Sequence, residues 1–454
     1  MTPSRRWIGP VLWIAMGLFL VARASARPSS RGVLLDHLEF GRRLVHGEDV
    51  YGPWKSDPDA PLRPLHAPYP PSFGLLTAPF HLVDATLGRR PARFGWALLQ
   101  VASLVVGALL LRRLLLARGA LGDGDPPLLD AAERRRWQWL WLATFLLTLR
   151  FVLRDTHGGG GNLINVAFVL LAYAASERGH DRRAGAWLAF SLVTKPTMVW
   201  LLPVFLLFGR WRTVAWTLLA GTGFVLLTMA LQRFELAPWW RWLQGSWALA
   251  TQADPWAVPA FEFPPFEWMN QALRFCLARW CGEVPVAFSA RVELGVAPGL
   301  GCDVATVGWI VRITSLGLLG AVLLVARRAR HRADARLWVV VGTFVLTLLL
   351  SPLSWKGHHV ALLPLLLLLV EHVWRTRSRA IAALLAMWFV TCSLPGGDLV
   401  GDAVDEWLNS VYVVTIGDVA LLGAALVGAW RAARSTPAEH RDAAPRRSLG
   451  EPGR

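Results

Sequence analysis

The sequence predicts an all-α protein that crosses a membrane many times, and three observations support this prediction. Of its 454 residues, 54% are hydrophobic, and the mean hydropathy is +0.40. Its 25 tryptophans are typical of chains with aromatic side chains at the membrane surface. Apolar segments long enough to cross about 30 Å of hydrocarbon recur along the chain. Ordinary soluble domains do not combine these features.

Ten apolar segments are long enough to form membrane helices. With shorter limbs added, we expect about 10–12 membrane-embedded helices in a single domain, residues 1–430. The polar tail, 431–454, is predicted to be disordered in the cytoplasm. The first segment ends near Ala24–Ala26, which also fits a cleaved signal peptide, but we favour a retained helix that serves as packing surface. The ten segments are 7–24, 92–111, 137–153, 161–176, 211–233, 304–326, 336–351, 358–374, 380–394 and 408–430.

Clusters of arginine between these segments predict the orientation of the chain. The net charge is +16, and its basic residues flank apolar segments instead of forming one patch, which argues against nucleic acid as a partner. By the positive-inside rule the clusters face the cytoplasm, in a plasma (inner) membrane. The remaining connections are then extracytoplasmic. These are residues 25–91, 154–160, 234–303, 351–357 and 395–407.

Residues 184–208 have basic loops at both ends, so the charge rule requires the chain to enter the membrane and return. We predict two short helical limbs with a break at Thr194–Pro196, because proline disfavours helix at the preceding residue. Lys195 would then lie on the outer side. The alternative is one proline-kinked span that breaks the charge rule.

The first outer loop, 25–91, begins with the charged stretch "DHLEFGRRLVHGEDVYG". An amphipathic helix over 34–45 would place Asp36 and Glu39 on one face, with His37 beside them. A shared carboxylate face suits a general base, and the alternative is that both residues only cap and solvate an interfacial helix. "YPPSFG", from Tyr69, reads as a turn before a short apolar segment.

Three later motifs fall on the same outer side. "THGGGGN", which ends at Asn162, has a glycine run that lets helices meet or lets backbone approach a ligand. "NQAL", which starts at Asn270, offers amides to hydroxyl groups. "SPLSWKGHH" brings Lys356, His358 and His359 to a helix start, which suits an anion such as phosphate. The alternative for this last motif is a snorkelling lysine with a tryptophan anchor.

The long outer segment 234–303 is rich in tryptophan, which suits sugar or lipid contact and equally suits anchoring at the interface. Its cysteines have no metal-binding spacing. In an oxidising outer compartment Cys281 and Cys302 are candidates for a disulfide, with Cys276 as the competing partner.

In this order, from residue 36 to 375, the motifs resemble glycosyltransferase family 87, the polyprenyl-phosphate-mannose-dependent mannosyltransferase-like family of the GT-C superfamily. The resemblance implies a GT-C-type fold and an integral membrane glycosyltransferase that acts at the extracytoplasmic face. Its donor would be a polyprenyl-phosphate sugar, typically mannose, and its acceptor a hydroxyl of a glycolipid or cell-envelope glycan. No cofactor or metal is expected, and membrane lipid surrounds the enzyme.

The resemblance also assigns roles to residues. Asp36 is implied as the general base, and Glu39 stays an alternative because the gap from Asp36 to the "GEDVYG" turn is shorter than in the family. Three cationic residues are implied to hold the donor phosphate, and four further residues are expected to contact substrate. The former are Lys356, His358 and His359, and the latter are Lys195, Asn162, Tyr69 and Asn270.

Two other functional classes stay open at this point. A lipid-linked glycan flippase or transporter predicts functional polar residues deep in the spans. A non-catalytic envelope assembly protein with the same fold is also consistent, because Gly159–Gly161 precede Asn162 where the family commonly has a glycine-glutamine pair.

Overall fold

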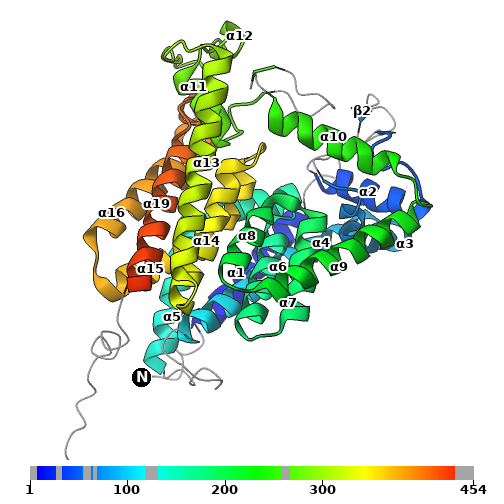
Figure 1. Ribbon diagram of the computed structural model, residues 1–454, viewed down its shortest axis with the longest axis horizontal. Helices are drawn as coiled ribbons and strands as arrows, with labels where there is room; N and C mark the ends of the chain where they lie inside the picture. The colour runs from blue at the N-terminus through cyan, green and yellow to red at the C-terminus, as the bar shows by residue number, and fades with distance from the viewer. Residues whose placement is uncertain are drawn as a thin grey trace, which may run out of the picture.

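The computed structural model describes residues 8–26, 33–54, 63–64, 69–117, 131–252, 254, 256–257 and 266–434. Most of these residues are helical (Figure 1). The ten segments predicted to be membrane helices all form helix. They correspond to α1 (Ile8–Ser25), α4 (Arg89–Leu116), α5 (Ala131–Gly158), α6 (Asn162–Glu177), α9 (Trp211–Leu231), α13 (Val304–Ala329), α14 (Ala333–Leu350), α15 (Leu363–Thr376), α16 (Arg379–Trp388) and α19 (Val413–Arg434).

Shorter elements connect them. These are α2 (Leu34–His46), α3 (Phe73–Leu87), α7 (Asp181–Thr194), η3 (Pro196–Trp200), α8 (Leu201–Leu207), α10 (Ala237–Thr251), α11 (Leu273–Cys281), α12 (Val286–Ser289), η4 (Lys356–Leu362), η5 (Phe389–Ser393), α17 (Gly397–Val400) and α18 (Asp402–Ser410). Among the described residues, strand occurs only as the two-residue antiparallel pair β1 (Pro53–Trp54) and β2 (Arg63–Pro64).

Six described helices are long and apolar enough to cross a membrane: α4, α9, α13, α14, η4 continued by α15, and α19. The pair α5–α6 also qualifies as one broken span, bent by 111° at the glycine run. Four shorter apolar segments accompany them: Trp13–Ser25, Phe73–Leu87, Pro196–Leu207 and Arg379–Ser393. The prediction of an all-α polytopic membrane protein is confirmed.

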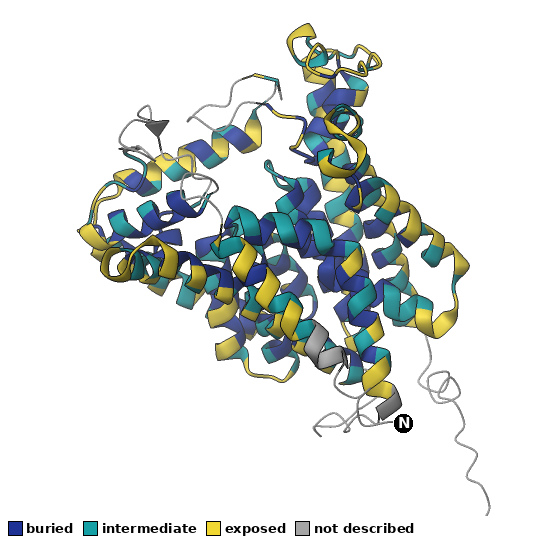
Figure 2. Ribbon diagram, turned by 180° about the vertical axis from the view of Figure 1, so that it is seen from behind, coloured by how far each residue is buried: buried dark blue, intermediate teal, exposed yellow. Residues whose placement is uncertain are grey.

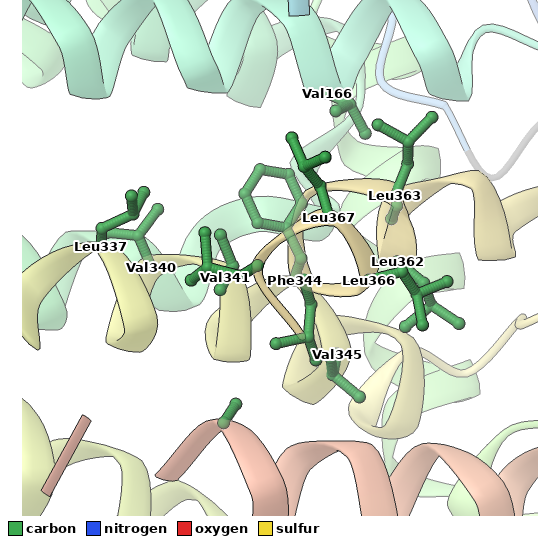
Figure 3. Packing of buried hydrophobic residues seen from close by; sticks show 14 of the residues in the cluster. Val166, Leu337, Val340, Val341, Phe344, Val345, Leu362, Leu363, Leu366 and Leu367 are labelled. Carbon is green, nitrogen blue, oxygen red and sulfur yellow. The ribbon is translucent and has the colours of Figure 1, made fainter. Parts of the chain in front are cut away.

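The core of the molecule forms where α14 and η4–α15 are enclosed by other helices. Figure 3 shows Val341, Phe344 and Val345 of α14 beside Leu366 and Leu367 of α15, all fully buried. The outer helices are much less buried than the central ones. In α14, 78% of the apolar window is buried, whereas the share is 17% in α9 and in α13. Figure 2 shows this change from buried centre to exposed rim. The apolar rim is suited to contact with lipid.

The segment 184–208 breaks where proline predicts. Helix α7 ends at Thr194, Lys195 is extended with φ −150° and ψ 94°, and η3 begins at Pro196. The predicted break is therefore confirmed. At the other end of the chain, α19 continues to Arg434, so residues 431–434 of the predicted tail are helical, and residues 435–454 lie outside the described residues.

Part of the tryptophan-rich segment 234–303 packs into a small aromatic core. Trp268 is buried against Phe266, with ring centroids 5.0 Å apart, and Tyr412 joins them. On α10, in contrast, Trp240 and Trp247 are exposed. Helix α10 is held at one end by an ion pair between Arg241 and Asp49. The aromatic residues thus divide between protein packing and exposed surface.

Candidate active site

Helix α2 forms where the sequence predicts it and positions two neighbouring polar residues. Asp36 is half-buried. His37 is buried, with its ring centroid 5.5 Å from Tyr69, 4.8 Å from Phe73 and 5.4 Å from Trp96. Burial, together with the positive charge of Lys195, lowers the pKa of His37 to about 3. The imidazole is therefore neutral at physiological pH and carries no phosphate-binding charge.

Glu39, the alternative base, is held by two arginines of its own helix. Its carboxylate accepts hydrogen bonds from Arg42 Nε at 2.8 Å and from Arg43 Nε at 2.6 Å. Burial alone raises the pKa of Glu39, but these hydrogen bonds outweigh burial and hold it below its usual value. A carboxylate stabilised in this way is a weak proton acceptor. Its visible role is to fix Arg43, which donates to Asp49 O at 2.9 Å.

Tyr69 lies among Asp36, Asp155 and Lys195, and we call this group the Tyr69 cluster. The Tyr51 hydroxyl donates to Tyr69 O at 2.7 Å, and the Tyr69 ring stacks on Phe73 with a centroid distance of 4.1 Å. Burial and the negative charges of Asp155 and Asp36 all raise the pKa of Tyr69. Both carboxylates thus act on this side chain from different helices, α5 and α2.

The glycine run joins α5 to α6 and lets them bend around a buried carboxylate. Asp155 accepts hydrogen bonds from Asn162 Nδ2 at 2.7 Å and from Leu163 N at 3.1 Å, so it caps the start of α6. A Cβ atom on Gly160 would overlap Asp155 Oδ1. Gly159 has a φ of +77°, and its Cβ would lie 2.7 Å from Leu34 Cβ of α2. The run therefore allows close backbone approach, as one of its predicted roles requires.

Lys195 extends this network from the break between α7 and η3. Its Nζ donates to Asn162 Oδ1 and lies 5.5 Å from the centroid of the Tyr69 ring. Burial lowers the pKa of Lys195 to about 8, although the charge of Asp155 acts in the opposite direction. A chain of contacts thus runs from Asp155 through Asn162 to the ammonium group.

The lysine and the two histidines of "SPLSWKGHH" lie in three different environments. His358 lies within electrostatic reach of Lys195, and Asn162 Nδ2 is 3.4 Å from the neighbouring Gly357 O. Lys356 instead forms an ion pair of 2.6 Å with Asp405 of α18. His359 Nε2 lies 3.0 Å from Asp418 Oδ2 of α19, and both side chains are fully buried. Of the three, His358 is the one that the structure brings to the Tyr69 cluster.

Asn270 holds backbone in this structure. Its Nδ2 donates to Pro352 O at 3.1 Å, and its Oδ1 accepts from Ser354 N at 2.9 Å. The neighbouring Gln271 N donates to Ser354 O at 2.8 Å. Asn270 therefore fixes the segment that leads to His358, whereas the sequence predicts contact with substrate hydroxyls.

Asp155 belongs to this cluster but is not among the site residues that the sequence predicts. Its position directly before a glycine run and seven residues before an asparagine was the available signal. Within the described ranges, no group of three or more histidine, cysteine or acidic residues is placed to hold a metal ion.

Carboxylate, ammonium and imidazole groups from several parts of this apolar helical bundle meet around Tyr69. This arrangement is expected of an integral membrane enzyme. The family model described as glycosyltransferase family 87 matches residues 67–352, more than half of the chain. The chain therefore belongs to glycosyltransferase family 87 and is a membrane glycosyltransferase. A search of curated proteins finds no match.

The matched region is shorter than the resemblance inferred from the motifs, which ran from 36 to 375. It contains Tyr69, Asn162, Lys195 and Asn270 but begins after α2 and ends before Lys356. The matched range thus includes Lys195 and excludes Asp36 and His358, and the roles of all the candidate site residues stay predictions.

Proposed function

We propose that this chain transfers a sugar, mannose in the simplest case, from polyprenyl phosphate to a hydroxyl of a glycolipid or cell-envelope glycan. The observation that carries this proposal is the convergence of opposite charges on Tyr69. Asp36 and Asp155 raise its pKa, while Lys195 Nζ lies 5.5 Å from its ring. Glycosyl transfer needs such a pair, a proton acceptor on one side of the sugar and a cation on the other.

In the proposed reaction, the acceptor hydroxyl loses its proton to the Asp36 carboxylate as its oxygen bonds to the anomeric carbon. Asp36 is preferred over Glu39 because two guanidinium groups already occupy the Glu39 carboxylate. A positioned general base contributes about 10²–10⁴-fold in rate. Attack from the side opposite the phosphate inverts the anomeric configuration.

The bond between the anomeric carbon and the phosphate oxygen breaks in the same step, and polyprenyl phosphate leaves with the bonding electrons. We assign the phosphate first to Lys195 and His358. Lys356 and His359 already have carboxylate neighbours, Asp405 and Asp418. The charge of Lys195 and a hydrogen bond from the His358 imidazole would stabilise charge that develops on the leaving group, and we propose a transfer that needs no metal or other cofactor.

On the basis of the positive-inside rule we propose that this cluster faces the extracytoplasmic side of the plasma membrane and that the C-terminus is cytoplasmic. That location fits the proposed substrates, because lipid-linked donor and envelope acceptor both present their sugars at a membrane surface.

The test uses the full chain in lipid nanodiscs, with radiolabelled polyprenyl-phosphate mannose as donor and a glycolipid extract as acceptor. We expect Asp36→Asn to lower transfer by about 10²-fold or more while donor binding is kept. Glu39→Gln is the matched control on the same helix, and we expect it to retain transfer within about tenfold of wild type.

Full transfer by Asp36→Asn would overturn the assignment of the base. Absence of transfer by wild type with any lipid-phosphosugar, together with loss of donor binding, would favour the non-catalytic assembly protein. Movement of labelled lipid across the membrane of reconstituted vesicles without a new glycosidic bond would favour the transporter.

A further inference from the structure

A polar cavity of about 240 Å³ lies where the end of α10 and helix α11 meet α13 and the end of α14. Gln252, Arg274, Arg312, Ser315 and Ser351 contribute polar groups to its wall. None of the candidate residues around Tyr69 lines it. The cavity is therefore a separate site, and the proposed sugar transfer gives it no role.

Arg312 is the first unusual feature of this cavity. It is the only charged residue between Val304 and Ala326 of α13, a helix that qualifies as a membrane span. Eight residues separate it from the start of α13, which places its Cα about 12 Å along the helix axis. A charge within a span is costly and usually marks a ligand or ion site. Its guanidinium carbon lies 5.1 Å from the centroid of the Trp309 ring.

Arg274 also lines the cavity and is half-buried, whereas Arg312 is exposed. Its Nη1 donates to Leu249 O at 2.5 Å and its Nη2 to Gln252 O at 2.7 Å, so it caps the C-terminal end of α10. These partners are neutral carbonyl groups, and burial lowers the pKa of Arg274. Its positive charge is therefore not neutralised by the contacts that position it.

No acidic side chain is among the described residues that line the cavity. The guanidinium groups of Arg274 and Arg312 and the hydroxyl of Ser315 thus line the same cavity, whereas the Ser351 hydroxyl donates to Leu353 O at 2.7 Å. Guanidinium forks and hydroxyl groups match the oxygens of phosphate. A free anion would not account for the apolar part of the wall, which includes Val311 and Leu350.

We propose that this cavity binds the phosphate headgroup of a membrane lipid, with Arg312 and Arg274 as its two cationic contacts. The acyl chain lies along α13, where Ile313 and Leu316 are each 67% exposed beside Arg312. Ser351 and Pro352 line the cavity and begin the segment that reaches His358. A bound lipid thus packs against the segment that leads to the proposed active site.

The test uses the full chain in phosphatidylcholine nanodiscs that contain a trace of diazirine-labelled phosphatidic acid or, in parallel, diazirine-labelled phosphatidylcholine. Peptide mapping after photolysis counts label in residues 307–315 and 349–352. We expect phosphatidic acid to label these peptides about tenfold more than phosphatidylcholine, because its exposed phosphate monoester gains charge-assisted hydrogen bonds. Arg312→Gln should bring this ratio close to one.

Arg327→Gln is the matched control, because Arg327 is exposed at the opposite end of the same helix. We expect it to leave the ratio unchanged. An equal ratio for the two lipids in wild type, or an unchanged ratio in Arg312→Gln, would overturn the proposal, as would loss of labelling on addition of inorganic phosphate, which would identify a free anion as the ligand. The assay scores lipid binding only, so its failure is distinct from a failure of sugar transfer.

Discussion

Asp155 shows how one buried side chain organises the polar cluster. It caps the start of α6 through Leu163 N, orients Asn162, and through Asn162 fixes Lys195. A buried carboxylate is tolerated when it accepts several hydrogen bonds and has a cation nearby. Asp155 is therefore a positioning residue, and Asp36 keeps the proposed role of base.

The glycine run allows a sharp test of this arrangement. Gly160→Ala would push a methyl group into the Asp155 carboxylate, so we expect donor binding and sugar transfer to fall at least tenfold. Gly161→Ala is the matched control, because the nearest atom to its Cβ is Trp96 Cζ2 at 3.7 Å, an ordinary contact. Equal activity of the two variants in the nanodisc transfer assay would contradict the structural role of Gly160.

Lys195 gives the site an expected pH dependence. Its pKa of about 8 lies below the usual lysine value because the side chain is buried. Below pH 8 the ammonium is charged and suited to the proposed contact with the donor phosphate, and above pH 8 it loses its proton. We therefore expect donor affinity to fall by up to about tenfold per pH unit above 8.

Equilibrium binding of labelled donor between pH 6.5 and 10 measures this effect. Lys195→Arg is the control, since guanidinium stays charged throughout the range. Its binding curve should be flat, even if its affinity at pH 7 is lower. An identical decline in both proteins would assign the pH dependence to another group.

At the scale of elements, short breaks and loops position side chains that come from distant parts of the chain. Asn270 and Gln271 pair with the backbone at Pro352 and Ser354, so the aromatic outer segment fixes the start of η4. Proline ends α7 at Thr194 and leaves Lys195 extended. These local breaks let side chains from separate helices meet at one point.

The backbone pairing of the segment before α13 also favours a disulfide bond. Cys302 N donates to Cys281 O at 2.8 Å, and Leu300 N donates to Trp280 O at 3.0 Å, so the two cysteines lie on neighbouring backbones. The competing Cys276 is buried in the aromatic cluster, and burial raises its pKa to about 12. Although all four cysteines are thiols in this structure, we predict that Cys281 and Cys302 become oxidised in an extracytoplasmic compartment.

Alkylation of denatured protein, purified from membranes without reductant, checks this prediction by mass spectrometry. We expect label on Cys276 and Cys392 only, and on all four cysteines after reduction. Cys281→Ser should lower the melting temperature, since a loop of this size contributes about 3 kcal/mol when closed. Labelling of all four cysteines without reduction would contradict the prediction.

At the scale of the whole molecule, charge asymmetry predicts how the bundle sits in the membrane. Arginine-rich connections such as the one at His180, between α6 and α7, should face the cytoplasm, and the loop at Ala297, before α13, should face outward. Both residues are exposed.

In a cysteine-free background, we expect Ala297→Cys to react with a membrane-impermeant maleimide in intact spheroplasts. We expect His180→Cys to react only after permeabilisation, and the permeabilised sample controls for accessibility. Labelling in the reverse order would invert the proposed orientation and move the site to the cytoplasmic face.

The sequence by itself determined the class of fold, the ten apolar helices, helix α2 and the break at Lys195. These features depend on local hydropathy, periodicity and proline sterics, all of which a linear sequence contains. Asp36, Tyr69, Asn162 and His358 were also identified as candidates from sequence order, although their roles stay predictions.

Only the tertiary structure decided which of these candidates meet. Glu39, Lys356 and His359 are suitable residue types, but each has a nearby structural partner, namely Arg43, Asp405 and Asp418 respectively. Asp155 accepts hydrogen bonds from Asn162 and Leu163. These two residues approach it because α5 and α6 are bent by 111° relative to each other. The pairing of charges depends on distances across the bundle, and spacing along the chain does not specify those distances.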